Sequence, residues 1–361
     1  MNINFFRSLP KMFLACLLVA VQACDNDPAP EIPIGSAGYF VVNEGGFRNS
    51  NTSISFYDRE KNTMTNDVFA AKNGRPLGDQ AQSLTVFEGK AYILVQNSSK
   101  IEVIDADDFS SIKTITEGIE SPRYFVGVNA NKGYVSDWED GFGGKVRVID
   151  LNTFTVIKNI ATGKGPNKMA LKDGMVYVAN SGGYDNDNTI SVIDTSTDAV
   201  SATIKVGDNP NSLQFDKEGN LWVANAGTFA YNEDYSIDEE HSTSSTISKV
   251  TNGTEVAQIP IEGIFYPGVA HLNINRNGDN LYYLFNGKVY SMPVSATATP
   301  STALLGDKYF YGLAVDPFND DVLACEAPDF SSIGKLYVYR DNALLFKTYD
   351  VGIAPNGIGF K

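Results

Sequence analysis

Histidine is almost absent from this chain of 361 residues, and cysteine and the basic residues are scarce. With His241 and His271 alone, a metal or catalytic centre built mainly from imidazoles is not expected. Three cysteines, Cys16, Cys24 and Cys325, are too few for a disulfide framework once the first two are assigned to a leader. The 28 basic residues stand against 43 acidic ones, and the formal net charge is -15. Because binding a phosphate backbone needs a basic surface, we expect no nucleic-acid partner.

The first 23 residues are typical of a signal peptide. Arg7 and Lys11 precede an apolar run over residues 12–21, and this run is shorter than the roughly 20 residues that cross a bilayer. Cys24 follows Ala23 directly, an arrangement that resembles a bacterial lipobox. We therefore expect cleavage before Cys24, lipidation of this cysteine and anchoring to a membrane. An ordinary signal peptide with an incidental cysteine is the alternative.

Residues 24–37 form an acidic and proline-rich tether in front of a domain over residues 38–361. The acidic segment 25–27 resembles the export signal that sends lipoproteins of some gut anaerobes to the outer face of the outer membrane. We therefore expect a lipid-anchored outer-membrane protein that faces the cell exterior. A merely polar linker is the alternative.

The chain after the tether repeats itself. Pro122, Pro166 and Pro210 are spaced by 44 and 44 residues, and Pro355 opens a similar segment at the end. Each unit predicts four short strands, which is typical of one blade of a β-propeller. No run of helical period is evident. The second strand of each unit ends near a polar residue, and seven such ends are found: Asn43, Asn97, Asp137, Asn180, Asn225, Asn286 and Glu326.

The two ends of the repeat are incomplete in complementary ways. The first unit starts directly at residues 38–43 and lacks an innermost strand, whereas residues 358–360 predict an inner strand with no blade after it. We therefore predict an all-β, seven-bladed β-propeller in which the C-terminal strand completes the first blade and closes the ring.

The motifs Tyr-Val-Ala-Asn at 177–180, Val-Ile-Asp at 192–194 and Pro-Asn at 166–167 resemble the YVTN (YncE-like) propeller repeat. The resemblance is strong over residues 80–226 and weakens over 250–345. The opening at 38–45, on a surface lipoprotein of this type, is similar to the BtuG family. This resemblance implies binding of cobalamin as a carried ligand and delivery to a TonB-dependent outer-membrane transporter. Because the chain has only two histidines, we also expect no enzymatic activity.

The blade topology predicts which face binds a ligand. In a four-stranded antiparallel blade, the loop after the second strand lies on the same face as the crossover to the next blade. Long loops on a rigid scaffold are a common place for binding residues. Those segments are rich in aromatic and amide side chains, which suit a large, flat ligand bearing amides, such as a corrinoid. The predicted ligand-binding residues are Asn43, Glu44, Phe47, Gln82, Arg123, Tyr124, Asp137, Trp138, Phe142, Asn167, Asn180, Tyr184, Asn211, Asn225, Phe229, Tyr231, Tyr266, Tyr311, Glu326 and Asn356.

Some of these residue types also have ordinary structural explanations. A strand-end asparagine often caps a turn through its own side chain, and loop aromatics often pack on one another. Asp185 and Asp187 alternate with asparagines as calcium ligands do, but an Asp/Asn-rich turn is the commoner case. His271 lies in an alternating run, where a satisfied core histidine is expected. Cys325 ends an apolar strand, where an inert buried thiol is expected.

Two other functions fit parts of the sequence. An adhesion or glycan-binding propeller would use the same aromatic loops. A propeller lactonase or lyase is disfavoured by the scarcity of histidine. The chain also shows no Walker loop, dinucleotide fingerprint or metalloprotease motif.

Overall fold

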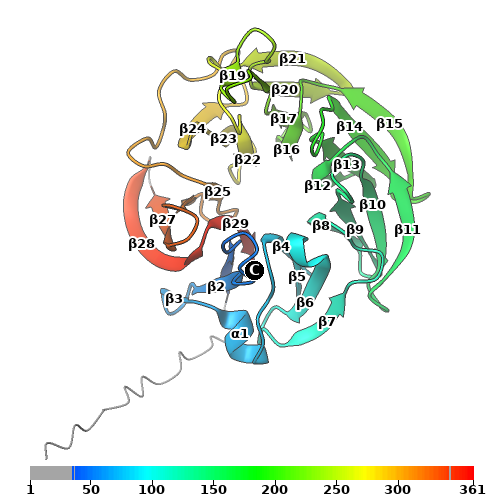
Figure 1. Cartoon of the computed structure of the whole chain (residues 1–361), viewed down its shortest axis with the longest axis vertical. Helices are drawn as coiled ribbons and strands as arrows, with labels where there is room; N and C mark the ends of the chain where they lie inside the picture. The colour runs from blue at the N-terminus through cyan, green and yellow to red at the C-terminus, as the bar shows by residue number, and fades with distance from the viewer. Residues whose placement is uncertain (1–34, 36, 341–342) are drawn as a thin grey trace, which may run out of the picture. The chain divides into compact units, whose positions relative to one another are not determined.

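Seven β-sheets surround a central axis in the computed structural model, which describes residues 35, 37–340 and 343–361 (Figure 1). Each sheet is one antiparallel blade, so the seven-bladed β-propeller predicted from the repeat is confirmed. The described residues belong to one compact unit. The predicted signal peptide, Cys24 and the tether as far as residue 34 lie outside the described residues.

The first blade joins the two ends of the domain. It contains β1 (Gly38–Asn43), β2 (Ser53–Asp58), β3 (Thr63–Thr65) and the C-terminal β29 (Pro355–Phe360), in the order β29-β1-β2-β3. Tyr39 pairs with Phe360, and Val41 pairs with Ile358. The predicted closure of the ring by the C-terminal strand is therefore confirmed, and it gives β1 a hydrogen-bonded neighbour on both sides.

The next four blades follow the predicted repeat. Pro122, Pro166 and Pro210 are the first residues of three innermost strands, where a missing N–H is tolerated. The strands are β4 (Ala81–Phe87), β5 (Lys90–Val95), β6 (Lys100–Asp105) and β7 (Ser111–Ile115); β8 (Pro122–Asn129), β9 (Lys132–Asp137), β10 (Lys145–Asp150) and β11 (Thr155–Ala161); β12 (Pro166–Lys172), β13 (Met175–Asn180), β14 (Thr189–Asp194) and β15 (Ala199–Lys205); β16 (Pro210–Phe215), β17 (Leu221–Asn225), β20 (Thr246–Thr251) and β21 (Thr254–Pro260).

The sixth and seventh blades differ in their number of strands. The seventh has four strands, β25 (Gly312–Val315), β26 (Val322–Glu326), β27 (Ile333–Arg340) and β28 (Leu344–Ile353). The sixth has only β22 (Ala270–Ile274), β23 (Asn280–Phe285) and β24 (Lys288–Pro293). A single bridge between Val289 and Leu305 stands where the outer strand would lie. The fourth strand predicted for this unit is therefore absent from the described residues, in the region where the repeat motif is weakest.

Apolar cores fill the spaces between neighbouring blades, because alternate residues of a strand point to opposite faces. In β1, Phe40 and Val42 pack toward the second blade, whereas Tyr39 and Val41 pack toward the seventh. Cys325 lies in the core between the seventh and first blades, and burial raises the pKa of its thiol to about 12. The expectation of a buried, unreactive thiol is consistent with this environment.

Helical structure is minor in the part of the chain that the structure describes. It consists of α1 (Val68–Asn73), which links the first two blades, and the single 3₁₀ turn η1 (Gln96–Ser98). Six residues are too few to show a helical period, so this helix was not predicted. Val68 and Phe69 of α1 cover the core between these blades. None of the described helices is long and apolar enough to cross a membrane.

Candidate functional site

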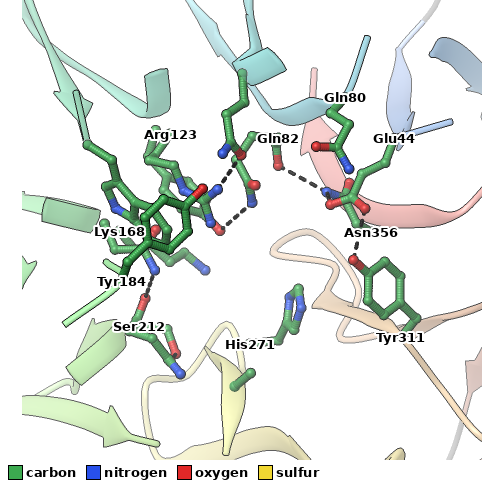
Figure 2. A pocket seen from close by; sticks show the side chains of 16 residues that line it. Glu44, Gln80, Gln82, Arg123, Lys168, Tyr184, Ser212, His271, Tyr311 and Asn356 are labelled. Carbon is green, nitrogen blue, oxygen red and sulfur yellow. Dashed lines mark hydrogen bonds between the residues drawn. The ribbon is translucent and has the colours of Figure 1, made fainter. Parts of the chain in front are cut away.

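A cavity of about 420 Å³ opens at the centre of the ring, where the innermost strands begin (Figure 2). Its wall consists of two sets of residues. One set comes from the first residues of innermost strands, as with Arg123 and Asn167. The other comes from the loops after second strands, as with Glu44, Trp138 and Tyr184. The binding face predicted from the blade topology therefore carries the central cavity.

Hydrogen bonds hold an acidic group at one side of this cavity. Glu44 follows β1 and accepts hydrogen bonds from the hydroxyl of Tyr311 at 2.8 Å and from Nδ2 of Asn356 at 2.6 Å. Tyr311 in turn packs edge-on against Phe330, with ring centroids 4.9 Å apart. Burial raises the pKa of the Glu44 carboxyl, and these two hydrogen bonds oppose that shift. The arrangement fixes a carboxyl group, an amide and a phenol in one place.

A cationic and aromatic group lies across the cavity from Glu44 (Figure 2). The Cζ atom of Arg123 lies 4.0 Å from the centroid of the Trp138 ring, which is a cation–π contact. The guanidinium also donates to the side-chain oxygen of Gln96 on η1. Burial lowers the pKa of Arg123. This group is therefore held by a ring and by neutral oxygen rather than by a carboxylate.

A second cavity of about 710 Å³ adjoins the first and shares Arg123, Trp138 and Tyr184 with it. Part of its wall is aromatic, since Phe229 and Tyr266 pack edge-on with ring centroids 5.1 Å apart and Tyr231 lines the same cavity. Tyr231 belongs to a hairpin of β18 (Ala230–Tyr231) and β19 (Ile237–Asp238), which lies within the extra length of the fifth unit. Single ligand sites commonly measure about 300–1,000 Å³, so the joined cavities suit a large ligand.

Thirteen of the predicted residues line these two cavities. They are Glu44, Gln82, Arg123, Tyr124, Trp138, Asn167, Tyr184, Asn211, Phe229, Tyr231, Tyr266, Tyr311 and Asn356. They come from six of the blades, and the innermost strands and loops gather them around one axis. The set combines carboxamides, phenols and rings, which can hold an extended surface and hydrogen-bond its polar edges.

Four strand-end residues predicted as ligand contacts have their side chains inside the blades instead. Asn180 is fully buried and donates to the hydroxyls of Thr189 and Ser191 on the next strand. Asn43 and Asn225 are fully buried and bond the equivalent hydroxyls of their own blades. Asp137 is buried against the guanidinium of Arg147, at 3.1 Å. In these four blades the strand-end residue therefore forms side-chain hydrogen bonds within its own blade.

The remaining predicted residues lie outside the two cavities. Phe47 and Phe142 are exposed loop aromatics, and Phe142 contacts the ring of Tyr184. Glu326 accepts a hydrogen bond from Tyr337 on the neighbouring strand.

The weak calcium candidates have protein partners. The carboxylate of Asp185 pairs with Lys164. That of Asp187 accepts hydrogen bonds from the Thr189 hydroxyl and the Lys164 backbone N–H. The described ranges, 35, 37–340 and 343–361, contain no group of three or more His, Cys, Asp or Glu side chains able to hold a metal ion.

His271 corrects one sequence-based expectation. It is the second residue of β22 and lines the central cavity rather than an apolar core. Burial, with the charge of Lys168 nearby, lowers the pKa of His271 to about 4. The alternating pattern predicted a strand correctly, but the inward side of an innermost strand faces the channel.

Sequence reasoning missed four further polar lining residues: Gln80, Gln96, Lys168 and Ser212. A signal was available for two of them. Lys168 and Ser212 directly follow the Pro-Asn pairs that mark strand starts. Burial lowers the pKa of Lys168 to about 8.

The fold resembles solved propellers of several kinds. One is a quinonprotein alcohol dehydrogenase-like protein from Bacteroides thetaiotaomicron, at 18% identity and a TM-score of 0.65, covering 91% of this chain and 79% of that one. Another is a candidate 6-phosphogluconolactonase from Bacteroides uniformis, at 13% identity and a TM-score of 0.63, covering 91% and 100%. A third is hydrazine synthase from Kuenenia stuttgartiensis, at 17% identity and a TM-score of 0.59, covering 77% and 89%. At such identities the likeness establishes the fold alone.

None of the curated proteins matches the sequence. A family model does match it, over residues 37–351, which is nearly the whole propeller. The chain therefore belongs to the family described as "Domain of unknown function (DUF5074)".

Proposed function

We propose that this protein is a binding protein that captures a corrinoid, cobalamin first of all, in the joined central cavities and passes it to a TonB-dependent outer-membrane transporter. The observation that carries the proposal is the ring of carboxamides and aromatic rings around one axis. Gln82, Asn167, Asn211 and Asn356 supply amides at the starts of innermost strands. A corrin ring bears amides along its edge and presents flat faces. Its amides can therefore pair with the carboxamides of the cavity, and its faces can stack on the aromatic rings.

Rigidity supports capture rather than rearrangement. Many of the lining residues stand at the starts of innermost strands, and each of these strands is hydrogen-bonded to the next strand of its own blade. Because such a scaffold loses little conformational entropy on binding, more of the contact free energy is left for affinity. The proposal includes the lipid anchor at Cys24 and the location on the outer face of the outer membrane, which follow from the predicted leader and tether.

Titration calorimetry of the chain from residue 25 with cyanocobalamin tests the proposal. We expect saturable one-to-one binding and co-elution of the red ligand with the protein. If neither occurs at micromolar concentrations, the corrinoid proposal is wrong, and a glycan array would then test an adhesion or glycan-binding role for the same aromatic surface.

A second candidate function is hydrolysis of a lactone. His271, Lys168 and Glu44 all line the cavity, which places a base and acidic groups together. Two solved propellers of similar fold are candidate 6-phosphogluconolactonases. Hydrolysis of 6-phosphogluconolactone above the spontaneous rate, and its loss in His271→Gln, would favour this function. Equal rates with and without the protein would exclude this substrate.

A further inference from the structure

Two positive groups in the central cavity have no carboxylate partner. Among residues 37–340 and 343–361, the ion pairs of this acidic protein include most of its arginines, but none includes Arg123 or Lys168. An enclosed cation is costly unless a counter-charge or several hydrogen bonds satisfy it. Within the described residues, neither cation is therefore neutralised by a carboxylate in direct contact.

Arg123 is oriented but incompletely satisfied. Its guanidinium lies against the Trp138 ring and donates to the neutral Gln96. Its Nε atom is buried and has no hydrogen-bond partner in the described structure. A guanidinium held in this way keeps free donors for a ligand and is positioned before the ligand arrives.

Lys168 extends the positive region toward the channel, where His271 adds a side chain that can accept a proton. Both residues also line a deeper cavity of about 230 Å³ that continues along the axis below the first. Burial is the cause of the lowered pKa of Lys168, and Lys168 contributes to the lowered pKa of His271. At neutral pH the lysine is charged and the imidazole is neutral. A negative group between them would favour protonation of both.

Within the described residues Glu44 forms no ion pair with Arg123, although the two charges attract one another across the cavity. Glu44 lies across the cavity, where its carboxyl oxygens accept from Tyr311 and Asn356 (Figure 2). Burial raises the pKa of this carboxyl, whereas its two hydrogen bonds and the charge of Arg123 lower it. The titratable side chains lining this cavity are Glu44, Arg123, Tyr124, Lys168, Tyr184, His271 and Tyr311, and the only carboxyl group among them is that of Glu44.

We propose that Arg123, Lys168 and His271 form a subsite for a phosphate group of the ligand. This inference rests on the proposed capture function and specifies it further. Two ligand classes carry such a group into a cavity of this kind: a complete corrinoid, through the phosphodiester of its nucleotide, and a phosphorylated sugar acid. The amide and aromatic wall would then bind the remainder of the molecule.

The first test compares ligands that differ in the phosphate. Cyanocobalamin carries the phosphodiester, whereas dicyanocobinamide keeps the corrin ring and its amides and lacks the nucleotide with its phosphate. We expect cyanocobalamin to bind more tightly, and we expect Lys168→Gln to reduce that advantage by about tenfold or more, as loss of a charge-assisted hydrogen bond does. Lys205→Gln makes the same charge change at an exposed position on β15 and should leave the advantage unchanged.

The second test uses inorganic phosphate and needs no corrinoid. With two histidines in the chain, proton NMR of the imidazoles gives two sets of ring signals, and His241→Gln assigns them. Saturating phosphate should raise the pKa of His271 in the native protein and do so much less in Lys168→Gln. The same experiment with 6-phosphogluconate and gluconate distinguishes a sugar phosphate from a corrinoid nucleotide as the source.

The two proposals fail in different ways. If cyanocobalamin and dicyanocobinamide bind equally and Lys168→Gln changes neither, the phosphate subsite is wrong and the corrinoid function survives. If no corrinoid binds but phosphate shifts His271 through Lys168, the subsite survives and the corrinoid function is wrong. If phosphate leaves His271 unchanged and no corrinoid binds, both are overturned.

Discussion

Trp138 offers the sharpest single-residue test of ligand capture. Its ring covers Arg123 and forms part of both joined cavities. We expect Trp138→Ala to weaken cyanocobalamin binding by about 1–3 kcal/mol, as truncation of a buried aromatic anchor does. Calorimetry would measure the change. Tyr235→Ala is the matched control, because Tyr235 is 88% exposed and lines neither cavity. Equal affinity in Trp138→Ala and Tyr235→Ala would contradict this placement of the ligand.

Asn180 should affect folding rather than binding. Its Nδ2 atom donates a buried hydrogen bond to Ser191 and a part-buried one to Thr189, both on β14. We expect Asn180→Ala to lower the free energy of unfolding by about 1–3 kcal/mol, because these two hydroxyls lose their donor. Urea unfolding would measure this loss. Cyanocobalamin affinity of the folded variant should be unchanged, and weakened binding at full stability would instead assign Asn180 to the ligand.

His271 should make stability depend on pH in a defined window. Its pKa is about 4 in the folded protein and 6.5 for an unperturbed ring. Between these values the unfolded chain binds more protons, so stability falls as the pH is lowered from 6.5 to 4. We expect the free energy of unfolding of His271→Gln to fall by about 2–3 kcal/mol less than that of the native protein over this pH range. Urea titrations at several pH values would measure it, with exposed His241→Gln as the control. Parallel curves for the native protein and His271→Gln would show that the ring titrates normally.

The residue scale also shows where sequence reasoning reaches its limit. Strand-end asparagines and strand-start asparagines both recur with the repeat. Asn180 bonds hydroxyls in its own blade, whereas Asn167 lies at the channel. The repeat predicts that an amide is required at each of these two positions. One sequence does not show whether the amide bonds within its blade or faces a cavity, because both roles favour an amide.

At the scale of elements, the hairpin of β18 and β19 can be tested as a removable unit. Thr228 and Thr243 bond one another at its base, through backbone and side chain. We expect replacement of residues 229–242 by Asn-Gly to keep the fold, because this pair can be joined by a tight turn. The change removes Phe229 and Tyr231 from the second cavity, so cyanocobalamin affinity should fall. Thermal unfolding and calorimetry would measure the two effects, and unchanged affinity would exclude the hairpin from the site.

Elements were predictable wherever the local pattern agreed with the blade. Pro122, Pro166, Pro210 and Pro355 begin innermost strands as the repeat predicts. The sixth blade was less predictable, because residues 294–304 are rich in Ser, Thr and Ala and provide few apolar side chains to hold an outer strand against the ring. The helix α1 was not predicted, since its role is to cover a core that only the assembled blades create.

At the scale of the whole molecule, stability should depend on ring closure. Removing residues 355–361 deletes β29, exposes the edge of β1 and opens the core shared by the seventh and first blades. We expect this truncated chain to aggregate or to unfold without a cooperative transition, because unpaired strand edges associate. Circular dichroism during heating and gel filtration would measure this. Removal of Lys361 alone leaves the pairing of β29 intact and serves as the control. A truncated chain that melts like the native protein would show that closure is dispensable.

The pairing of β29 with β1 also determines when the ring can close during synthesis. During synthesis Phe40 is made well before Gly359, its partner on β29. Until β29 has been synthesised, the first blade lacks its inner strand and the ring stays open. The complete ring therefore cannot form while the chain before β29 is being made. The native ring forms only after β29 has been made, which suits a polypeptide whose predicted leader would send it through a membrane before it folds.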